Sequence, residues 1–194
     1  MNAYGPSFRH ITPDHTVFEN KTVHKWFSVN IDLNLDDNTA NEDRANIFAL
    51  TDGTEYPNIG SQIPAVYLLP ESMTLQVCMF MDGEESLCTE AGDAPIGEWF
   101  NLRVEQYCWV PWSDYCYVFI YVEETEKFFW WNDTPATFYN VKGVLGETYG
   151  RDDIVAASGK YAHFTLDQCE DVDDNCNVDF LTQTQPTHEN AVNV

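Results

Sequence analysis

Hydrophobic and polar residues alternate along several stretches of this chain. From residue 27 to residue 35, every odd-numbered residue is apolar and every even-numbered residue is polar. A period of two is typical of a β-strand with one face on the core and the other in solvent. We therefore predict a half-buried strand over residues 26–35.

Similar strand patterns recur along most of the chain, separated by short stretches of turn residues such as Asp82-Gly83. The strongest lies over residues 115–123 and should form a hairpin with 127–131 through a turn at 124–126. No segment has a helical period of ten or more residues. About ten short strands without helices indicate an all-β sandwich of two antiparallel sheets. The other strands are expected at residues 46–51, 65–69, 74–80, 98–106, 138–144 and 160–166.

We expect a single domain. The strand patterns extend over residues 17–167, which we assign to the sandwich. Residues 1–16 are predicted to be an irregular N-terminal segment, and residues 168–194 an acidic loop and a polar tail. Neither of these two stretches has a periodic apolar pattern.

The chain has 194 residues and a formal net charge of −23, yet 44% of its residues are hydrophobic. That apolar content is sufficient for a folded core. The negative charge argues against nucleic acid and anionic membrane as partners, because both bind cationic surfaces. No apolar run approaches the roughly 18 residues that span a bilayer, so we expect no membrane insertion.

Six cysteines fall into three close pairs along the chain. Each pair brackets a turn-like segment, which favours sequential pairing, although other connectivities and six reduced core thiols are alternatives. The sequence contains no Cys-x-x-Cys motif and no histidines at zinc-ligand spacing. The expected bridges are Cys78–Cys88, Cys108–Cys116 and Cys169–Cys176.

Disulfides and two N-glycosylation sequons, at Asn20 and Asn132, point to the secretory compartment. The first residues lack the basic and apolar regions of an intact secretory leader, so we expect a mature or partial chain. We predict a secreted, extracellular glycoprotein with these two asparagines as acceptors.

The order of elements resembles that of the concanavalin A-like, laminin-G-like jelly-roll superfamily. The resemblance rests on KWFSVNIDLNL, NIFALTDG, PAVYLLP with TLQVCMF, EWFNLRVEQ and the hairpin YVFIYVEETEKFFWW. Gly97-Glu-Trp99 fits the family's GxWxxLxVxQ-like strand. Pro135-Ala-Thr-Phe138 and Asn140-Val-Lys142 fit its Pro-x-x-Phe-x-Asn-Val-Lys segment, whereas Glu-Thr-Glu replaces the usual Asn-Gly hairpin turn. The resemblance implies a jelly-roll sandwich that acts as a lectin, an adhesion module or a retaining glucanase.

We expect no enzymatic activity. Retaining glucanases of this superfamily carry a Glu-x-Asp-x-x-Glu strand, which places two carboxylates about 5 Å apart. Glu123, Glu124 and Glu126 come nearest to that spacing, but the central Asp is missing and the cluster lies in a turn. No serine-nucleophile, phosphate-loop or zinc-protease motif occurs, and His163 is interpreted as a structural strand histidine.

The segment between Cys108 and Cys116 is rich in aromatic residues. Rigid aromatic faces stack on sugar rings or anchor a protein partner, and a neighbouring carboxylate accepts hydrogen bonds from hydroxyl groups. The alternative is that these rings cap one end of the sandwich. The candidate ligand-binding residues are Trp109, Trp112, Asp114 and Tyr115.

A second aromatic feature is predicted on the sheet itself. If the aliphatic residues Val118, Ile120 and Val122 face the core, the aromatic residues between them lie on the opposite face. So aromatic an outer face predicts a binding interface, unless a loop or a terminal segment covers it. This stripe consists of Tyr117, Phe119 and Tyr121, with Phe129 and Trp131 (or Phe128 and Trp130) across the hairpin.

Acidic residues gather in the expected Cys169–Cys176 loop. Calcium takes six to eight oxygen ligands, which this loop could supply in part. The alternative is a solvated charged loop. The candidate ligands are Asp171, Asp173 and Asp174, and calcium is the only cofactor that we expect.

The favoured function is binding or assembly. We expect an extracellular structural or adhesion protein that contacts other copies of itself, or matrix, through the aromatic stripe and the termini. Because like charges repel, a stable oligomer needs burial of the stripe or bound cations. The alternative is a carbohydrate-binding lectin that recognises glycans with the Trp-rich loop.

Overall fold

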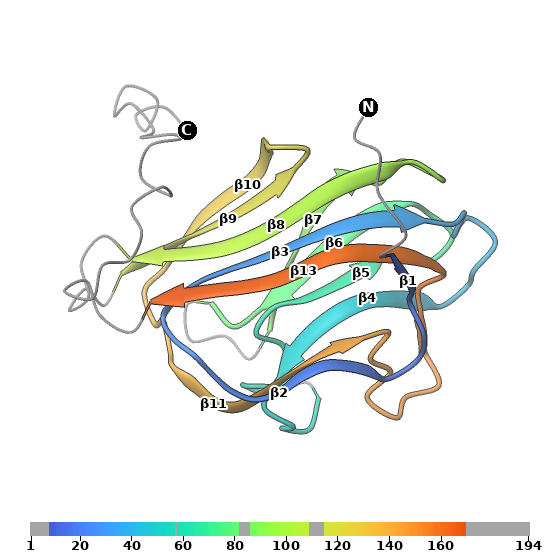
Figure 1. The fold of residues 1–194 in the computed structure, drawn as a ribbon. Helices are drawn as coiled ribbons and strands as arrows, with labels where there is room; N and C mark the ends of the chain where they lie inside the picture. Colours follow the sequence, from blue (N-terminus) through green and yellow to red (C-terminus); the bar gives the residue numbers. More distant parts are fainter. Residues whose placement is uncertain (1–7, 57, 82–85, 109–114, 170–194) are drawn as a thin grey trace.

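The computed structural model describes residues 8–56, 58–81, 86–108 and 115–169, and this part of the chain contains strands but no helix. The strands form two sheets that pack face to face around one core (Figure 1). All but one of the strand pairings are antiparallel. The predicted all-β sandwich of two antiparallel sheets is therefore confirmed.

In the first sheet, sheet A, the last strand of the described chain, β13 (Gly159–Cys169), lies beside β3 (Trp26–Leu35), the strand predicted over residues 26–35. Its last three strands follow one another in sequence, so one side of the sheet is built from successive hairpins. In order across the sheet, the strands are β1 (Arg9–His10), β13 (Gly159–Cys169), β3 (Trp26–Leu35), β8 (Trp99–Cys108), β9 (Cys116–Val122) and β10 (Thr125–Asn132).

The second sheet, sheet B, covers the other side of the core. In order across the sheet, its strands are β2 (His15–Val23), β11 (Phe138–Leu145), β4 (Arg44–Thr51), β5 (Ala65–Leu68), β6 (Thr74–Met79) and β7 (Leu87–Asp93). The short strand β12 (Ile154–Ala156) pairs with β4 in parallel.

The core lies between the inner faces of the two sheets. Ile31 and Leu33 of β3 have no exposed surface, and neither have Leu50 of β4 and Leu75 of β6. Along β8, buried and half-buried residues alternate without interruption. The period of two in the sequence therefore identified the inward-facing residues of β3 and β8 correctly, because each of these two strands has one face on the core.

Four strands were not predicted, and three of them are edge strands. β1, β2 and β7 bury little of their surface, so their sequences lack a regular apolar alternation. The fourth, β12, is only three residues long. The segment 1–16, expected to be irregular, contains β1 and the start of β2.

The turn between β9 and β10 is one residue earlier and shorter than predicted. It consists of Glu123 and Glu124, which have φ angles of 52° and 60°. Two-residue hairpin turns of this kind need positive φ at both positions, which Asn and Gly adopt more easily than Glu.

Two of the three predicted disulfides lie between described residues and are confirmed. Cys78–Cys88 joins directly opposite residues of β6 and β7, with a Cα–Cα distance of 4.0 Å. Cys108–Cys116 joins opposite residues of β8 and β9, with a Cα–Cα distance of 4.1 Å. Cys169 is also disulfide-bonded, but its predicted partner Cys176 lies outside the described residues.

Candidate functional site

The aromatic stripe predicted from the sequence lies on one face of sheet A. Along β9, Val118 and Ile120 are buried in the core, so the aromatic residues that alternate with them, Tyr117, Phe119 and Tyr121, lie on the outer face. Residues directly opposite each other on neighbouring strands share a face. β10 places Phe129 opposite Phe119 and Trp131 opposite Tyr117. We call the five residues Tyr117, Phe119, Tyr121, Phe129 and Trp131 the aromatic face.

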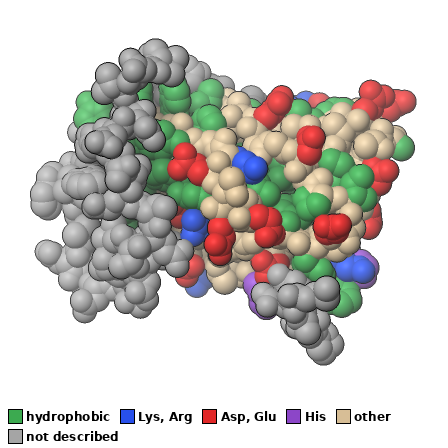
Figure 2. All heavy atoms as spheres, turned by 90° about the horizontal axis from the view of Figure 1, so that it is seen from above, with side chains coloured by type: hydrophobic (Ala, Val, Ile, Leu, Met, Phe, Trp, Pro, Cys, Tyr) green, Lys and Arg blue, Asp and Glu red, His purple; other side chains and the backbone are tan. Residues whose placement is uncertain are grey.

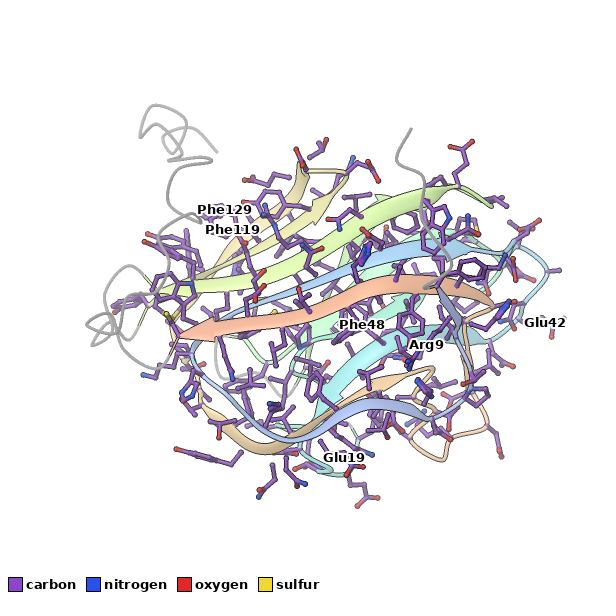
Figure 3. All side chains as sticks on the ribbon, in the orientation of Figure 1. Arg9, Glu19, Glu42, Phe48, Phe119 and Phe129 are labelled. Carbon is purple, nitrogen blue, oxygen red and sulfur yellow. A yellow bond between two sulfur atoms is a disulfide. The ribbon has the colours of Figure 1, made fainter. Side chains whose placement is uncertain are left out.

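Four rings of the aromatic face, those of Tyr117, Phe119, Tyr121 and Phe129, pack against one another across and along the strands. Tyr117 and Phe129 are stacked, with ring centroids 5.4 Å apart and an interplanar angle of 18°. Phe119 and Tyr121 are stacked at 6.0 Å and 19°. In Figure 3, Phe119 and Phe129 lie side by side near β9 and β10, whereas Phe48 lies between the two sheets. The rings therefore use much of their flat surface on each other.

Exposure increases across the aromatic face towards the edge of sheet A. Tyr121 is 8% exposed, whereas Phe129 is 40% and Trp131 is 53% exposed. Trp130 precedes Trp131 in an extended strand, yet the two indole rings stack at 5.1 Å. Since successive strand residues point to opposite faces, this contact requires at least one of the indoles to turn around the edge of β10.

A charged pair adjoins the aromatic face on β8. The guanidinium of Arg103 lies 4.2 Å from the ring centroid of Tyr121, and its Nε lies 3.5 Å from Oε2 of Glu105. Burial raises the pKa of Glu105, and the charge of Arg103 opposes this rise. Burial, followed by the charge of Glu105, raises the pKa of Tyr121 to about 12. At neutral pH Tyr121 is therefore a neutral hydroxyl.

A polar cluster lies further along the same face. Nδ2 of Asn101 donates hydrogen bonds to Oδ1 of Asn30 at 2.6 Å and to Oδ1 of Asp32 at 2.9 Å. Nδ1 of His163 lies 2.7 Å from Oδ2 of Asp32. A β-bulge in β13 and a positive φ at His163 bring the imidazole to this carboxylate. The cluster combines amide, carboxylate and imidazole groups, all of which bind hydroxyl groups.

Sequence reasoning did not find this polar cluster as a site. Its asparagine and aspartate residues occupy the polar positions of predicted strands, where solvent exposure alone explains them. What brings these residues together is the register of β3 and β8, which places Asp32 opposite Asn101 and Asn30 opposite Arg103. That register is known only when β3 and β8 are placed side by side.

The other predicted ligand residues have different outcomes. Tyr115 is described and is 65% exposed. Trp109, Trp112 and Asp114 lie outside the described residues, and so do the predicted calcium ligands Asp171, Asp173 and Asp174. Among the described residues, no group of three or more His, Cys, Asp or Glu side chains is arranged to hold a metal ion. Calcium binding by the acidic loop therefore stays a prediction.

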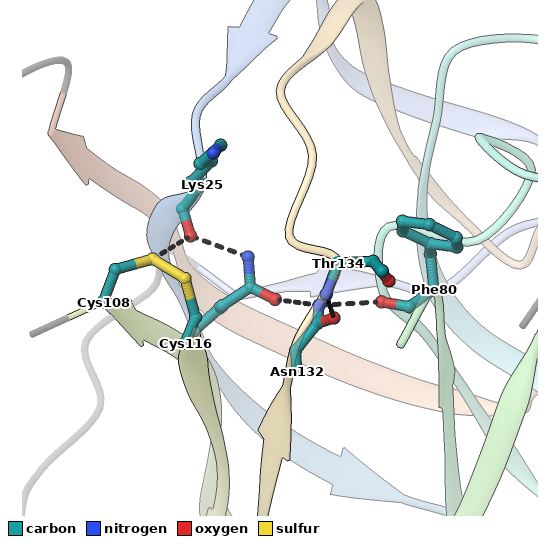
Figure 4. The surroundings of a disulfide bond; sticks show 7 residues. Lys25, Phe80, Cys108, Cys116, Asn132 and Thr134 are labelled. Atoms are coloured by element: carbon teal, nitrogen blue, oxygen red, sulfur yellow. Dashed lines mark hydrogen bonds between the residues drawn. A yellow bond between two sulfur atoms is a disulfide. The ribbon is translucent and has the colours of Figure 1, made fainter. Parts of the chain in front are cut away.

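The two predicted glycosylation sites differ in their surroundings. Asn20 is exposed on β2. Asn132 is 1% exposed, and its Nδ2 donates hydrogen bonds to Oε1 of Gln106 at 2.8 Å and to the carbonyl of Phe80 at 3.3 Å (Figure 4). A glycan on Nδ2 of Asn132 would displace these bonds, so we retain only Asn20 as an acceptor in the folded protein.

The disulfide beside Asn132 belongs to the same buried arrangement. Nε2 of Gln106 donates to the carbonyl of Lys25 at 2.7 Å (Figure 4). Sγ of Cys108 lies 3.4 Å from the same carbonyl oxygen, but a disulfide sulfur carries no hydrogen to donate. This network joins β8, β10 and the segment before β3 beneath one end of sheet A.

Comparison with protein-family models and with curated proteins gives no match for this sequence. Solved structures give matches of low sequence identity. A heptameric SAP-like pentraxin from Limulus polyphemus matches with a TM-score of 0.53 and 11% identity, over 82% of this chain and 75% of the pentraxin. An endo-β-1,4-glucuronan lyase from Trichoderma reesei matches with a TM-score of 0.52 and 8% identity, over 84% and 79%. The receptor-binding domain of botulinum neurotoxin D matches with a TM-score of 0.50 and 13% identity, over 77% and 35%.

These matches correct one expectation. We expected a protein without enzymatic activity, but a polysaccharide lyase has the same fold. The missing glucanase motif therefore does not exclude an enzyme, because catalytic residues converge from different strands.

Two expectations receive support from the structure and the matches. The two disulfides indicate an oxidising compartment, and the matches support the predicted fold. As a separate finding, no helix of the described residues is long and apolar enough to cross a membrane. At this level of identity the matches establish the fold. The chain has the concanavalin A-like jelly-roll fold that the order of its sequence elements resembles.

Proposed function

We propose that this protein is an extracellular binding module that docks a protein partner on the aromatic face of sheet A. The observation that carries the proposal is the partial exposure of a continuous aromatic surface. Phe129 remains 40% exposed, although its ring stacks on Tyr117 and packs against Phe119, and Trp131, opposite Tyr117 on β10, is 53% exposed.

The exposed part of this surface is large enough to matter for binding. Covering the remaining area of two such rings removes about 200 Å² of apolar surface from water, which contributes about 5 kcal/mol before the costs of association. Aromatic residues of this kind are enriched at the centres of protein interfaces. The half-buried Tyr117 and Phe119 hold the exposed rings in place, so little side-chain entropy is lost on binding.

The stacking geometry favours a protein partner over a sugar. Sugar rings pack on the flat faces of aromatic rings, and in the aromatic face those surfaces contact neighbouring rings. Of the two partners expected, another copy and a matrix component, charge favours the second. Each copy carries a net charge of −23, so two copies repel each other.

A second candidate function, glycan binding, is supported by the polar cluster of Asn30, Asp32, Asn101 and His163. Such groups recognise hydroxyls, and the cluster lies on the same face as the aromatic residues. A glycan array separates the candidates, because Asp32→Ala should abolish reproducible glycan binding. Trp112→Ala tests the original hypothesis that the Trp-rich loop supplies the lectin site.

A photo-crosslinking residue tests the protein-binding proposal. We expect benzoylphenylalanine in place of Phe129 to form a discrete covalent adduct with a partner in the native extracellular material. The matched control is the same substitution at Tyr139, which is 66% exposed on β11 of sheet B. Adducts from position 139 alone, or from both positions equally, would contradict the assignment of the binding face.

A further inference from the structure

We propose that the outer edge of β10, with which no described strand pairs, binds an extended segment of a partner protein that is rich in arginine or lysine, and that this segment adds to sheet A as a further strand. This inference rests on the proposed function, since it specifies how the partner of the aromatic face is held.

The first argument is that no described strand pairs with the outer edge of β10. Among the described strands, only β9 pairs with β10, which is therefore the last strand on that side of sheet A. An unpaired strand edge presents a row of backbone N–H and C=O groups that can pair with another chain. Addition of a peptide strand to such an edge is a recurring mode of recognition.

The disulfide indicates which backbone groups face outwards. The Cα–Cα distance of 4.1 Å between Cys108 and Cys116 is close to the roughly 4.5 Å of an antiparallel pair without mutual hydrogen bonds. The backbone groups of Cys116 therefore point away from β8, towards β10. Cys116 lies opposite Asn132, so the backbone groups of Asn132 point back to β9. Because this direction alternates along a strand, the backbone groups of Trp131 and Phe129 point to the outer edge of β10.

The side chains at this edge fit a cationic segment. A bulge between Glu126 and Phe128 interrupts the start of β10, so the regular part is Phe128–Asn132. Alternate side chains of an added strand would lie beside Phe129 and Trp131 on the outer face. The aliphatic stems of arginine and lysine can pack on the exposed parts of these rings, while their charged groups stay in water beside the acidic residues of this edge.

Charge identifies the class of partner. Exposed acidic residues lie at both ends of β10: Glu123 and Glu124 in the turn before it, Glu126 in its first residues, and Asp133 after it. Lys127 is the only basic residue within β10. Figure 2, which looks down on the molecule of Figure 1, shows many acidic and few basic side chains on the face turned to the viewer. A basic strand is attracted here, whereas an acidic strand, including β10 of a second copy, is repelled.

The probe for this inference is a peptide of eight residues, the length of β10, that alternates arginine and valine. Its control alternates glutamate and valine. We expect the arginine peptide alone to bind, and to slow amide hydrogen exchange at Phe129 and Trp131 about tenfold at saturation. Trp131→Pro removes an outward N–H and should abolish this protection without the loss of a bond to β9.

Two further variants keep the test decisive. Trp131→Lys leaves the backbone intact and should weaken peptide binding through charge repulsion, whereas Tyr139→Ser on sheet B should leave it unchanged. Equal binding of both peptides, or binding that survives both Trp131 variants, would overturn the inference. Protection of the β10 amides that rises with protein concentration alone would identify a second copy instead. If the peptide fails but crosslinking from position 129 succeeds, the binding face stands and only the strand-addition inference falls.

Discussion

Phe129 on β10 lies directly opposite Phe119 on β9, and their ring centroids are 5.1 Å apart. This cross-strand contact joins the exposed edge of sheet A to the half-buried rings of β9. An outer sheet face of this kind gains nothing from exposure to water, so its aromatic content needs another explanation. The partner that we propose for this face would supply that explanation.

The disulfide between β8 and β9 should stabilise the strands that carry the aromatic face. Replacing Cys108 and Cys116 together by serine is expected to lower the free energy of unfolding by about 2.5 kcal/mol, because the bridge restricts the unfolded chain. Urea unfolding checks the value. Non-reducing peptide mapping of the native protein should recover Cys108 joined to Cys116, and a Cys78–Cys108 peptide would contradict the pairing.

Asn132 should be a structural residue and not a glycan acceptor. Asn132→Ala removes one partner from the buried bonds to Gln106 and Phe80, so we expect a loss of about 2 kcal/mol in stability. Asn20→Gln should remove the glycan from protein secreted by eukaryotic cells and should cost less stability than Asn132→Ala, because Asn20 is exposed and only its φ of 56° disfavours glutamine. Glycosidase treatment followed by mass spectrometry would refute this assignment if it found a glycan at Asn132.

The sequence was informative where a strand has one buried and one exposed face. β3 and β8 alternate so regularly that the core positions could be predicted, and the aromatic stripe followed from the same alternation in β9. β2 and β7 lie at sheet edges and bury too little for a periodic signal. The polar cluster depends on the pairing of β3 with β8 and on a bulge in β13, and neither is encoded in local sequence patterns.

The turn between β9 and β10 is a place where the protein can be made more stable. Glu124 has a φ of 60°, a backbone conformation that is unfavourable for any residue with a side chain and favourable for glycine. Glu124→Gly should therefore raise the free energy of unfolding by about 1 kcal/mol. The matched control is Glu126→Gly in β10, where glycine only adds freedom to the unfolded chain and should destabilise. Thermal unfolding of both variants decides the point, and the same sign for both would contradict the turn geometry.

Glu105 should make stability depend on pH. Burial raises its pKa in the folded protein above the usual value near 4.5, so the folded state holds this proton more tightly than the unfolded state. The contribution of Glu105 to stability is fully present below that value and is lost as pH rises through the folded pKa. Relative to Glu105→Gln, the wild-type protein should therefore lose stability above about pH 4.5. Glu98→Gln, at an exposed position before β8, serves as the matched control for the change from glutamate to glutamine.

The central claim is that a partner covers the aromatic face. Hydroxyl-radical footprinting of the protein in its native extracellular material, compared with the purified protein, tests this directly. We predict that Phe129 and Trp131 react in the purified protein and are protected in the native material, while Tyr139 reacts equally in both. Equal reactivity of Phe129 and Trp131 in the two samples, or protection already present in the purified monomer, would contradict the claim.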